Sequence, residues 1–386
     1  MINDSTHPVW AMAFRPLYLL AALYGALSIL LWGFGYQGTA QLPAFFWHAH
    51  EMIWGYAGAI VVAFLLTAVA TWTQQPAVRG KPLILLTSLW LLARLFAFIP
   101  HAAWLSGITG TLFYGLAAYL MGLAVVRSRN HRNYIAVFAL LLFGLSHLGF
   151  HYSLQFATAG LRQGLFAGLV LVAGFIGLIG TRIIPFFTSR RLNTPQIATP
   201  TGLAYAPLVL PMVMAVCMSL QMALPLAALC GITAGAIGLI QTGRWLEKGV
   251  WQEPMLWILH VGYALTALGL IIMGIGQWQA SVLSMGVHLV TVGGIGLLTI
   301  GMMTRTALGH TGRPLYPAPF PMTWAFWLML AATLTRTITA LSMSSSPTTY
   351  QHGLKLSAIL FAVSLLLFAW RYFPWLTQAR ADGKAG

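Results

Sequence analysis

Seven of the eleven histidines of this chain fall toward one predicted side of an apolar sequence, although the segments that carry them are far apart. These seven are His48, His50, His101, His147, His151, His288 and His352. Among the five acidic residues of the chain, Glu51 alone falls within a predicted apolar span. Ionisable groups inside a bilayer are costly, so they are rare and usually functional. Because imidazole is the commonest side-chain metal ligand, histidines gathered at one membrane depth indicate bound haem or copper.

The elements that must position these histidines are membrane-spanning helices. Of the 386 residues, 59% are hydrophobic and 6% are charged, whereas a soluble domain has about 25% charged residues. The predicted fold class is therefore all-α, a polytopic integral membrane helix bundle. A helix needs about 20 apolar residues to cross a bilayer. On that measure there are about twelve spans, over residues 17–36, 46–72, 82–100, 105–126, 134–158, 164–188, 201–222, 224–244, 254–276, 281–303, 321–341 and 350–372.

The basic residues of the loops predict the orientation of these spans. With the N-terminus placed in the cytoplasm, all but four of the twenty Lys and Arg residues fall on the cytoplasmic side, where membrane proteins concentrate them. The prediction is therefore N-in and C-in, with residues 1–386 forming a single transmembrane domain and the first helix retained rather than cleaved. The net charge of +15 reflects this topology, so we expect lipid, and no nucleic acid, as a partner.

Three spans bring histidines to similar depths below the predicted outer boundary. His147 and His151 are four residues apart, so they share one face of the fifth span. At a rise of 1.5 Å per residue, His151 and His288 both lie roughly 10 Å deep, with His50 slightly shallower. His48 and His50 are two residues apart and point to nearly opposite faces. One of them can therefore be a ligand while the other supports a ligand.

Each of these histidines also has a reading without a metal. His101 and His352 fall at helix ends, where an interfacial side chain is the commoner role. His147 and His151 would alternatively form hydrogen bonds between helices, as polar side chains do in lipid.

Two arginines lie within spans, near the predicted outer ends. A guanidinium at the positions of Arg94 and Arg336 needs an anion, and three are available: Glu51, a lipid phosphate or a haem propionate. Arg336 has the further option of extending its side chain to the interface.

Several strings of the sequence resemble the signature of the NnrS family across the whole length of the chain. They are Phe-Arg-Pro at 14–16, Trp-His-Ala-His-Glu-Met at 47–52, Phe-Leu-Leu-Thr-Ala-Val at 64–69, His-Leu-Val-Thr-Val-Gly-Gly-Ile-Gly at 288–296, Gly-Met-Met-Thr-Arg at 301–305 and Leu-Gly-His-Thr-Gly-Arg-Pro at 308–314. The resemblance implies a twelve-span protein of the bacterial inner membrane that contains haem b and copper. It also implies a link to nitric oxide metabolism and nitrosative stress.

The resemblance, with an analogy to haem–copper oxidases and nitric oxide reductases, leads to site assignments. His50 and His288 are expected as axial haem ligands, because the low-spin haem of those enzymes bridges the second and tenth helices. His147 and His151, with His48 as the candidate third member, are expected to form a second site for copper or another haem. The assignments for the remaining groups are Arg94 and Arg336 as partners of haem propionates, and Glu51 as a group that orients a histidine or relays protons.

Three classes of function stay open at the level of sequence. The first is a haem and copper protein that binds nitric oxide or, as an oxidoreductase, converts it with electrons from an unidentified donor such as a quinone or a cytochrome. The second is a proton-coupled transporter that uses Glu51 and the histidines. The third is a non-catalytic sensor of nitric oxide or haem. A chromophore in the purified protein would separate the second class from the others, and turnover would separate the first from the third.

Overall fold

The computed structural model describes residues 5–157, 160–342 and 345–384, and every regular element within them is helical. In these residues, fourteen α-helical segments form twelve continuous helices, because π-helical turns join α2 to α3 and α11 to α12. Eleven of the described helices are long and apolar enough to cross a membrane, so the chain is a multi-pass membrane protein by helix length and hydropathy. The all-helical fold with twelve helices is confirmed, whereas the N-in and C-in orientation stays a prediction.

The remaining helix, α4 (Lys81–Phe96), is shorter than the span predicted over residues 82–100. Its 16 residues end at Phe96, and the next two turns close through bonds from Phe98 N to Leu95 O and from Ile99 N to Phe96 O. Pro100 follows, and the residue before a proline is disfavoured in the α conformation. The proline therefore ends this helix earlier than its hydropathy predicts.

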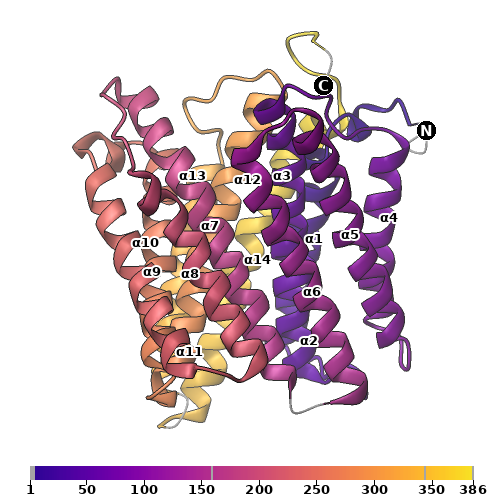
Figure 1. The fold of residues 1–386 in the computed structure, drawn as a ribbon, viewed down its shortest axis with the longest axis vertical. Helices are drawn as coiled ribbons and strands as arrows, with labels where there is room; N and C mark the ends of the chain where they lie inside the picture. The colour runs from indigo at the N-terminus through magenta and orange to yellow at the C-terminus, as the bar shows by residue number, and fades with distance from the viewer. Residues whose placement is uncertain (1–4, 158–159, 343–344, 385–386) are drawn as a thin grey trace. The chain divides into compact units, whose positions relative to one another are not determined.

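The first of two compact units comprises Met1–Gly168, Met303–Pro317 and Leu365–Gly386. Within it, α5 packs against α4 and α6, while α3 packs against α1 and α5 (Figure 1). Its complete helices are α1 (Phe14–Gly33), α2 (Ala44–His50), the π-helical turn η2 (Glu51–Ala57), α3 (Gly58–Thr73), α4, α5 (Ala103–Arg127) and α6 (Tyr134–Phe156).

The start of α1 and the end of α14 lie together in this unit. Arg15 donates hydrogen bonds from Nη1 to the carbonyl oxygens of Leu376 at 3.2 Å and Gln378 at 2.7 Å. A cation at this position satisfies carbonyls that a helix leaves unpaired at its C-terminal end. The first helix thus begins, and the last helix ends, at the same end of this unit.

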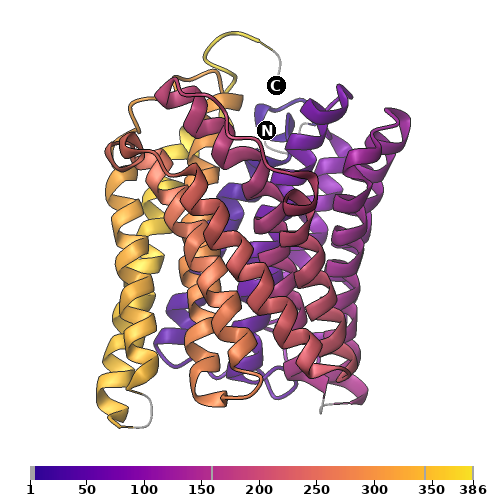
Figure 2. The same ribbon diagram turned by 60° about the vertical axis from the view of Figure 1, so that its left-hand side comes forward.

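The second unit comprises Leu169–Met302 and Ala318–Ser364. Here α10 packs against α9 and against the π-helical turn η6, and α13 packs on η6 as well; Figure 2 turns α8, α9 and α10 toward the viewer. The helices that contribute to this unit are α7 (Leu161–Leu192), α8 (Thr201–Leu220), α9 (Leu224–Trp245), α10 (Pro254–Ile275), α11 (Ala280–His288), η6 (Leu289–Gly296), α12 (Leu297–His310), α13 (Met322–Leu341) and α14 (Pro347–Thr377).

Glycines bring α10 close to α11 and η6 in the second unit. A Cβ atom on Gly286 would lie 2.8 Å from the backbone nitrogen of Met273, and one on Gly269 would lie 2.6 Å from Val290 Cγ2. Small residues of this kind let helix backbones approach each other in a membrane protein. The helix that carries His288 is therefore held tightly against its neighbour.

Candidate metal centre

Three imidazole rings converge in the interior of the first unit. His50 is the last residue of α2, whereas His147 and His151 lie on one face of α6. The Nε2 atom of His50 is 2.9 Å from His151 Nε2 and 3.2 Å from His147 Nε2. One ligand atom from each residue lies within 4.8 Å of the other two. These residues, the three-histidine cluster, can hold a metal ion.

The spacing of the cluster suits a shared ion. Metal–nitrogen bonds of about 2.0–2.1 Å in a tetrahedral arrangement place two imidazole nitrogens about 3.3 Å apart. The observed separations of 2.9 and 3.2 Å between the Nε2 atoms are close to that value. The two separations that involve His50 are therefore already near the distance that binding of a common ion requires.

Aromatic side chains enclose the cluster. The Trp54 ring lies 5.4 Å from the His50 ring and 5.5 Å from the His147 ring, while the Phe150 ring lies 5.3 Å from His50. His50 and His147 have no exposed surface, and His151 is 7% exposed. Because water is largely excluded, electrostatic interactions of a bound ion are stronger here than in solvent.

Glu51 connects the cluster to an arginine. Its Oε1 lies 2.6 Å from His50 Nδ1, and its Oε2 accepts hydrogen bonds from Tyr24 OH at 2.6 Å and from Arg94 Nη1. A carboxylate beside Nδ1 holds the proton on that nitrogen, so Nε2 keeps the lone pair that binds a metal. Carboxylate–histidine pairs of this kind orient metal ligands in many sites.

Helix α5 forms the wall against which the two histidines of α6 rest. A Cβ on Gly110 would lie 2.6 Å from His147 Cε1, and one on Gly107 would lie 2.7 Å from His151 Cγ. Thr111 adds a hydrogen bond at 3.1 Å between its Oγ1 and His147 Nδ1. The missing side chains at the two glycines therefore make the room in which these imidazoles lie.

A π-helical turn begins directly after His50. It spans Glu51–Ala57, and side chains from neighbouring helices bond to its carbonyl oxygens: Trp90 Nε1 donates to Gly55 O at 2.9 Å, and Tyr114 OH donates to Trp54 O. Wider turns of this type are rare and are frequent at functional sites. These donors from α4 and α5 stabilise the turn and thereby the positions of His50 and Glu51.

Two further histidines of the first unit, which were predicted on the same side as His50, lie outside the cluster. The ring of His48 stacks on Trp32, with centroids 4.6 Å apart and planes 7° from parallel. His101 is exposed at a turn, in the left-handed region with φ at 64°. The structure thus separates His48 from His50, as their spacing predicts, and it is His50 that points toward His147 and His151.

His288 and Arg336 belong to the second unit. The Nδ1 of His288 lies 2.6 Å from Ser284 O, which leaves Nε2 as the nitrogen with a lone pair. Arg336 is 7% exposed; its Nη2 donates to Tyr350 OH at 3.4 Å, and its Nη1 has no hydrogen-bond partner among the described residues. His352, at the start of α14, is exposed. That His50 and His288 share a haem stays a prediction, as do the propionate contacts of Arg94 and Arg336.

Four residues that form hydrogen bonds within the site had no place in the sequence predictions: Tyr24, Trp90, Thr111 and Tyr114. Each is a polar or amphipathic side chain on an apolar helix, and nothing in its local sequence distinguishes it from an interfacial or packing residue. The sequence feature that could have indicated this wall of the site is the pair Gly107 and Gly110, since glycines three residues apart mark a helix face that a neighbour approaches closely.

The fold and the cluster define a class of protein. It is an all-helical, multi-pass membrane protein whose interior carries three buried histidines able to bind a metal. A family model described as "NnrS protein" matches residues 8–380. The chain therefore belongs to the NnrS family, as its sequence motifs predicted. No curated protein matches the chain with significance.

Proposed function

We propose that this chain is a haem- and copper-containing protein of nitric oxide metabolism or nitrosative stress resistance in the bacterial inner membrane. Copper is held by His50, His147 and His151, and nitric oxide binds or undergoes a redox reaction at the histidine-ligated centres. The observation that carries the proposal is the convergence of the three Nε2 atoms in an enclosed, aromatic environment.

Copper suits this set of donors. Imidazole nitrogen binds zinc, copper, iron and nickel, and among divalent ions of the first transition row Cu²⁺ binds most tightly. Zinc has no redox chemistry, so a reaction with nitric oxide that transfers an electron favours copper. Glu51 positions His50 for ligation through its contact with Nδ1.

The second unit offers residues for the haem. His288 has Nδ1 engaged with Ser284 O, so Nε2 is suited to axial ligation. The buried Nη1 of Arg336 is a donor that a propionate would satisfy. When bound, haem would supply the redox-active iron to which nitric oxide coordinates. His50 cannot be both the second axial ligand of the haem and a ligand of copper, because its Nδ1 is engaged with Glu51 and its Nε2 binds one metal.

The test is to purify the chain in detergent and to record oxidised and dithionite-reduced spectra with metal analysis. We expect reduced b-type bands that shift when nitric oxide is added, together with about one copper per chain, as one three-imidazole site binds one ion. His147→Ala should lose copper and keep haem, whereas His288→Ala should lose the haem bands and keep copper. His352→Ala, at an exposed helix start, should keep both.

Other outcomes contradict the proposal or narrow it to binding alone. A folded protein without colour or metal would favour a proton-coupled transporter in which Glu51 and the histidines carry protons. A chromophore that binds nitric oxide without turnover would favour a sensor. Haem that persists in His288→Ala would remove that histidine from the haem site.

A further inference from the structure

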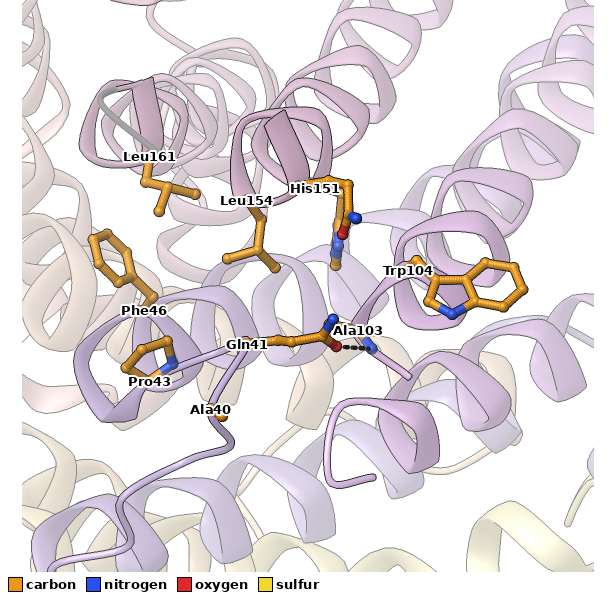
Figure 3. Close-up of a pocket in the computed structure, with 10 residues that line it drawn as sticks. Ala40, Gln41, Pro43, Phe46, Ala103, Trp104, His151, Leu154 and Leu161 are labelled. Carbon is orange, nitrogen blue, oxygen red and sulfur yellow. Dashed lines mark hydrogen bonds between the residues drawn. The ribbon is translucent and has the colours of Figure 1, made fainter. Parts of the chain in front are cut away.

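A pocket of about 360 Å³ in the first unit borders the three-histidine cluster. Its walls come from the segment before α2, from α2 itself, from the start of α5, the end of α6 and the first residue of α7. In Figure 3, His151 and Leu154 point into this space from α6, with Gln41 lying opposite them. His151 is the member of the cluster that lines the pocket.

The remainder of the cluster has no exposed surface. His50 and His147 are fully buried, and the rings of Trp54, Phe150 and Tyr114 lie against them. Among the three histidines, His151 is the one that borders the pocket, so a molecule in the pocket reaches the cluster at His151.

We propose that this pocket is the access chamber for a small, uncharged, membrane-soluble ligand of the cluster. The inference rests on the proposed function, because it requires that the cluster holds a metal. Seven of the ten lining residues are apolar or aromatic, the others are Gln41, His151 and Gln155, and no Asp, Glu, Lys or Arg occurs among these described lining residues. Such walls disfavour an ion, since a charge enters an apolar environment only at high cost.

The size of the pocket fits a chamber rather than a tight binding site. A water molecule occupies about 30 Å³ of liquid volume, so a space of about 360 Å³ accommodates several diatomic molecules. Trp104, which lines the pocket, is 54% exposed at the start of α5. Exposed tryptophans of membrane proteins concentrate at the membrane interface, so we expect the outer wall of the chamber beside the hydrocarbon layer, in which a small uncharged molecule dissolves.

Gln41 holds two walls of the chamber together. Its Oε1 accepts a hydrogen bond from the backbone nitrogen of Ala103 at 3.3 Å, across the space in front of His151. The turn that carries Gln41 is braced by bonds from Leu42 N to Thr39 Oγ1 and from Thr39 N to Leu42 O. The segment before α2 is thus tied to α5 at the side of the chamber.

The first experiment measures access without any metal. Leu154→Cys is made in a chain whose Cys217 and Cys230 are replaced by alanine, and it is treated with methyl methanethiosulfonate or its charged sulfonatoethyl analogue. We expect the uncharged reagent to react at least about tenfold faster than the charged one, because the walls exclude ions. Leu140→Cys, at a fully buried position of the same helix, is the control that should not react. A Leu154→Cys that is as unreactive as this control would overturn the inference.

The second experiment narrows the chamber in the copper-loaded protein. Ala103→Phe, or Ala40→Phe at an exposed lining position, should slow nitric oxide association by at least about tenfold in stopped-flow measurements with copper content unchanged. Leu112→Phe, on the exposed face of α5, should leave the rate unchanged. Unaltered rates in fully loaded variants would refute the access chamber alone, whereas failure of the unmutated chain to bind copper would refute the proposed function.

Discussion

The Nδ1 atom of His50 lies 2.6 Å from Oε1 of Glu51, its neighbour in the chain. Adjacent residues of an α-helix point about 100° apart, and here the helix widens into a π-helical turn at Glu51. The second carboxylate oxygen of Glu51 bonds to Tyr24 and Arg94. The side chain of Glu51 thus joins α1 and α4 to the imidazole whose Nε2 faces the cluster.

Replacing this carboxylate should weaken metal binding. Loss of a group that orients a ligating histidine typically costs about 10–100-fold in metal affinity, and we expect Glu51→Gln to fall within that range in copper titrations. Glu253→Gln is the matched control, because Glu253 pairs with Arg191 at a partly exposed position far from the cluster in sequence. Equal affinities of the two variants would show that Glu51 does not orient His50.

Replacing Arg94 alone should lower the stability of the protein more than replacing Arg94 and Glu51 together. In Arg94→Leu the buried Glu51 keeps its charge without a cation, and breaking a buried ion pair in this way costs about 3–5 kcal/mol of stability. The double variant Glu51→Gln/Arg94→Leu should recover most of that loss in thermal unfolding. Arg191→Leu, at an ion pair with 39% of the arginine exposed, should cost about 0–1 kcal/mol. Additive losses in the double variant would argue against coupling of Glu51 and Arg94.

A methyl group on the α5 wall should displace a ligand. Gly110→Ala places a Cβ 2.6 Å from His147 Cε1, and overpacking of this kind costs about 1–3 kcal/mol. Because the ring itself must move, we expect reduced copper content and an altered electron paramagnetic resonance spectrum of Cu²⁺. Gly115→Ala on the same helix meets nothing within 4 Å, so its spectrum should match that of the unmutated protein. A normal spectrum in Gly110→Ala would mean that the ring is not held at this wall.

The π-helical turn should depend on its side-chain donors. Tyr114→Phe removes the hydrogen bond to Trp54 O, and a loss of about 0.5–1.5 kcal/mol is expected for one such bond. Tyr119→Phe, at a position of α5 that is 62% exposed, should change stability by less than about 0.5 kcal/mol. Thermal unfolding in detergent compares the two variants, and an equal effect would contradict a stabilising role of Tyr114.

The helices of this protein follow closely from hydropathy. The span predicted over 254–276 is the helix Pro254–Ile275, and that over 134–158 is Tyr134–Phe156. Inside lipid, a spanning segment must satisfy its backbone hydrogen bonds within itself, which leaves the helix as the available form. Helix α4 is shorter than the predicted span because Pro100 ends it early, and hydropathy takes no account of the backbone effect of a proline.

Part of the candidate metal site could be predicted from the spacing of its residues in the sequence. The shared face of His147 and His151 follows from their spacing of four residues, and the division of His48 from His50 follows from a spacing of two. Pairing His50 with the two histidines of α6 did not follow, because it depends on which helices are neighbours. The partners Tyr24, Thr111 and Tyr114 depend on the same arrangement.

The sequence by itself determined the class of this protein, its helices and the residue types that can bind a metal, since hydropathy, helical periodicity and the cost of buried polar groups act locally. The tertiary structure decided which of those residues meet. Rotation and spacing of packed helices depend on side-chain fit, as at Gly107 and Gly110, where the missing side chains admit His151 and His147. Contacts of that kind join residues about a hundred positions apart, such as His50 and His151, and no local pattern of the chain encodes them.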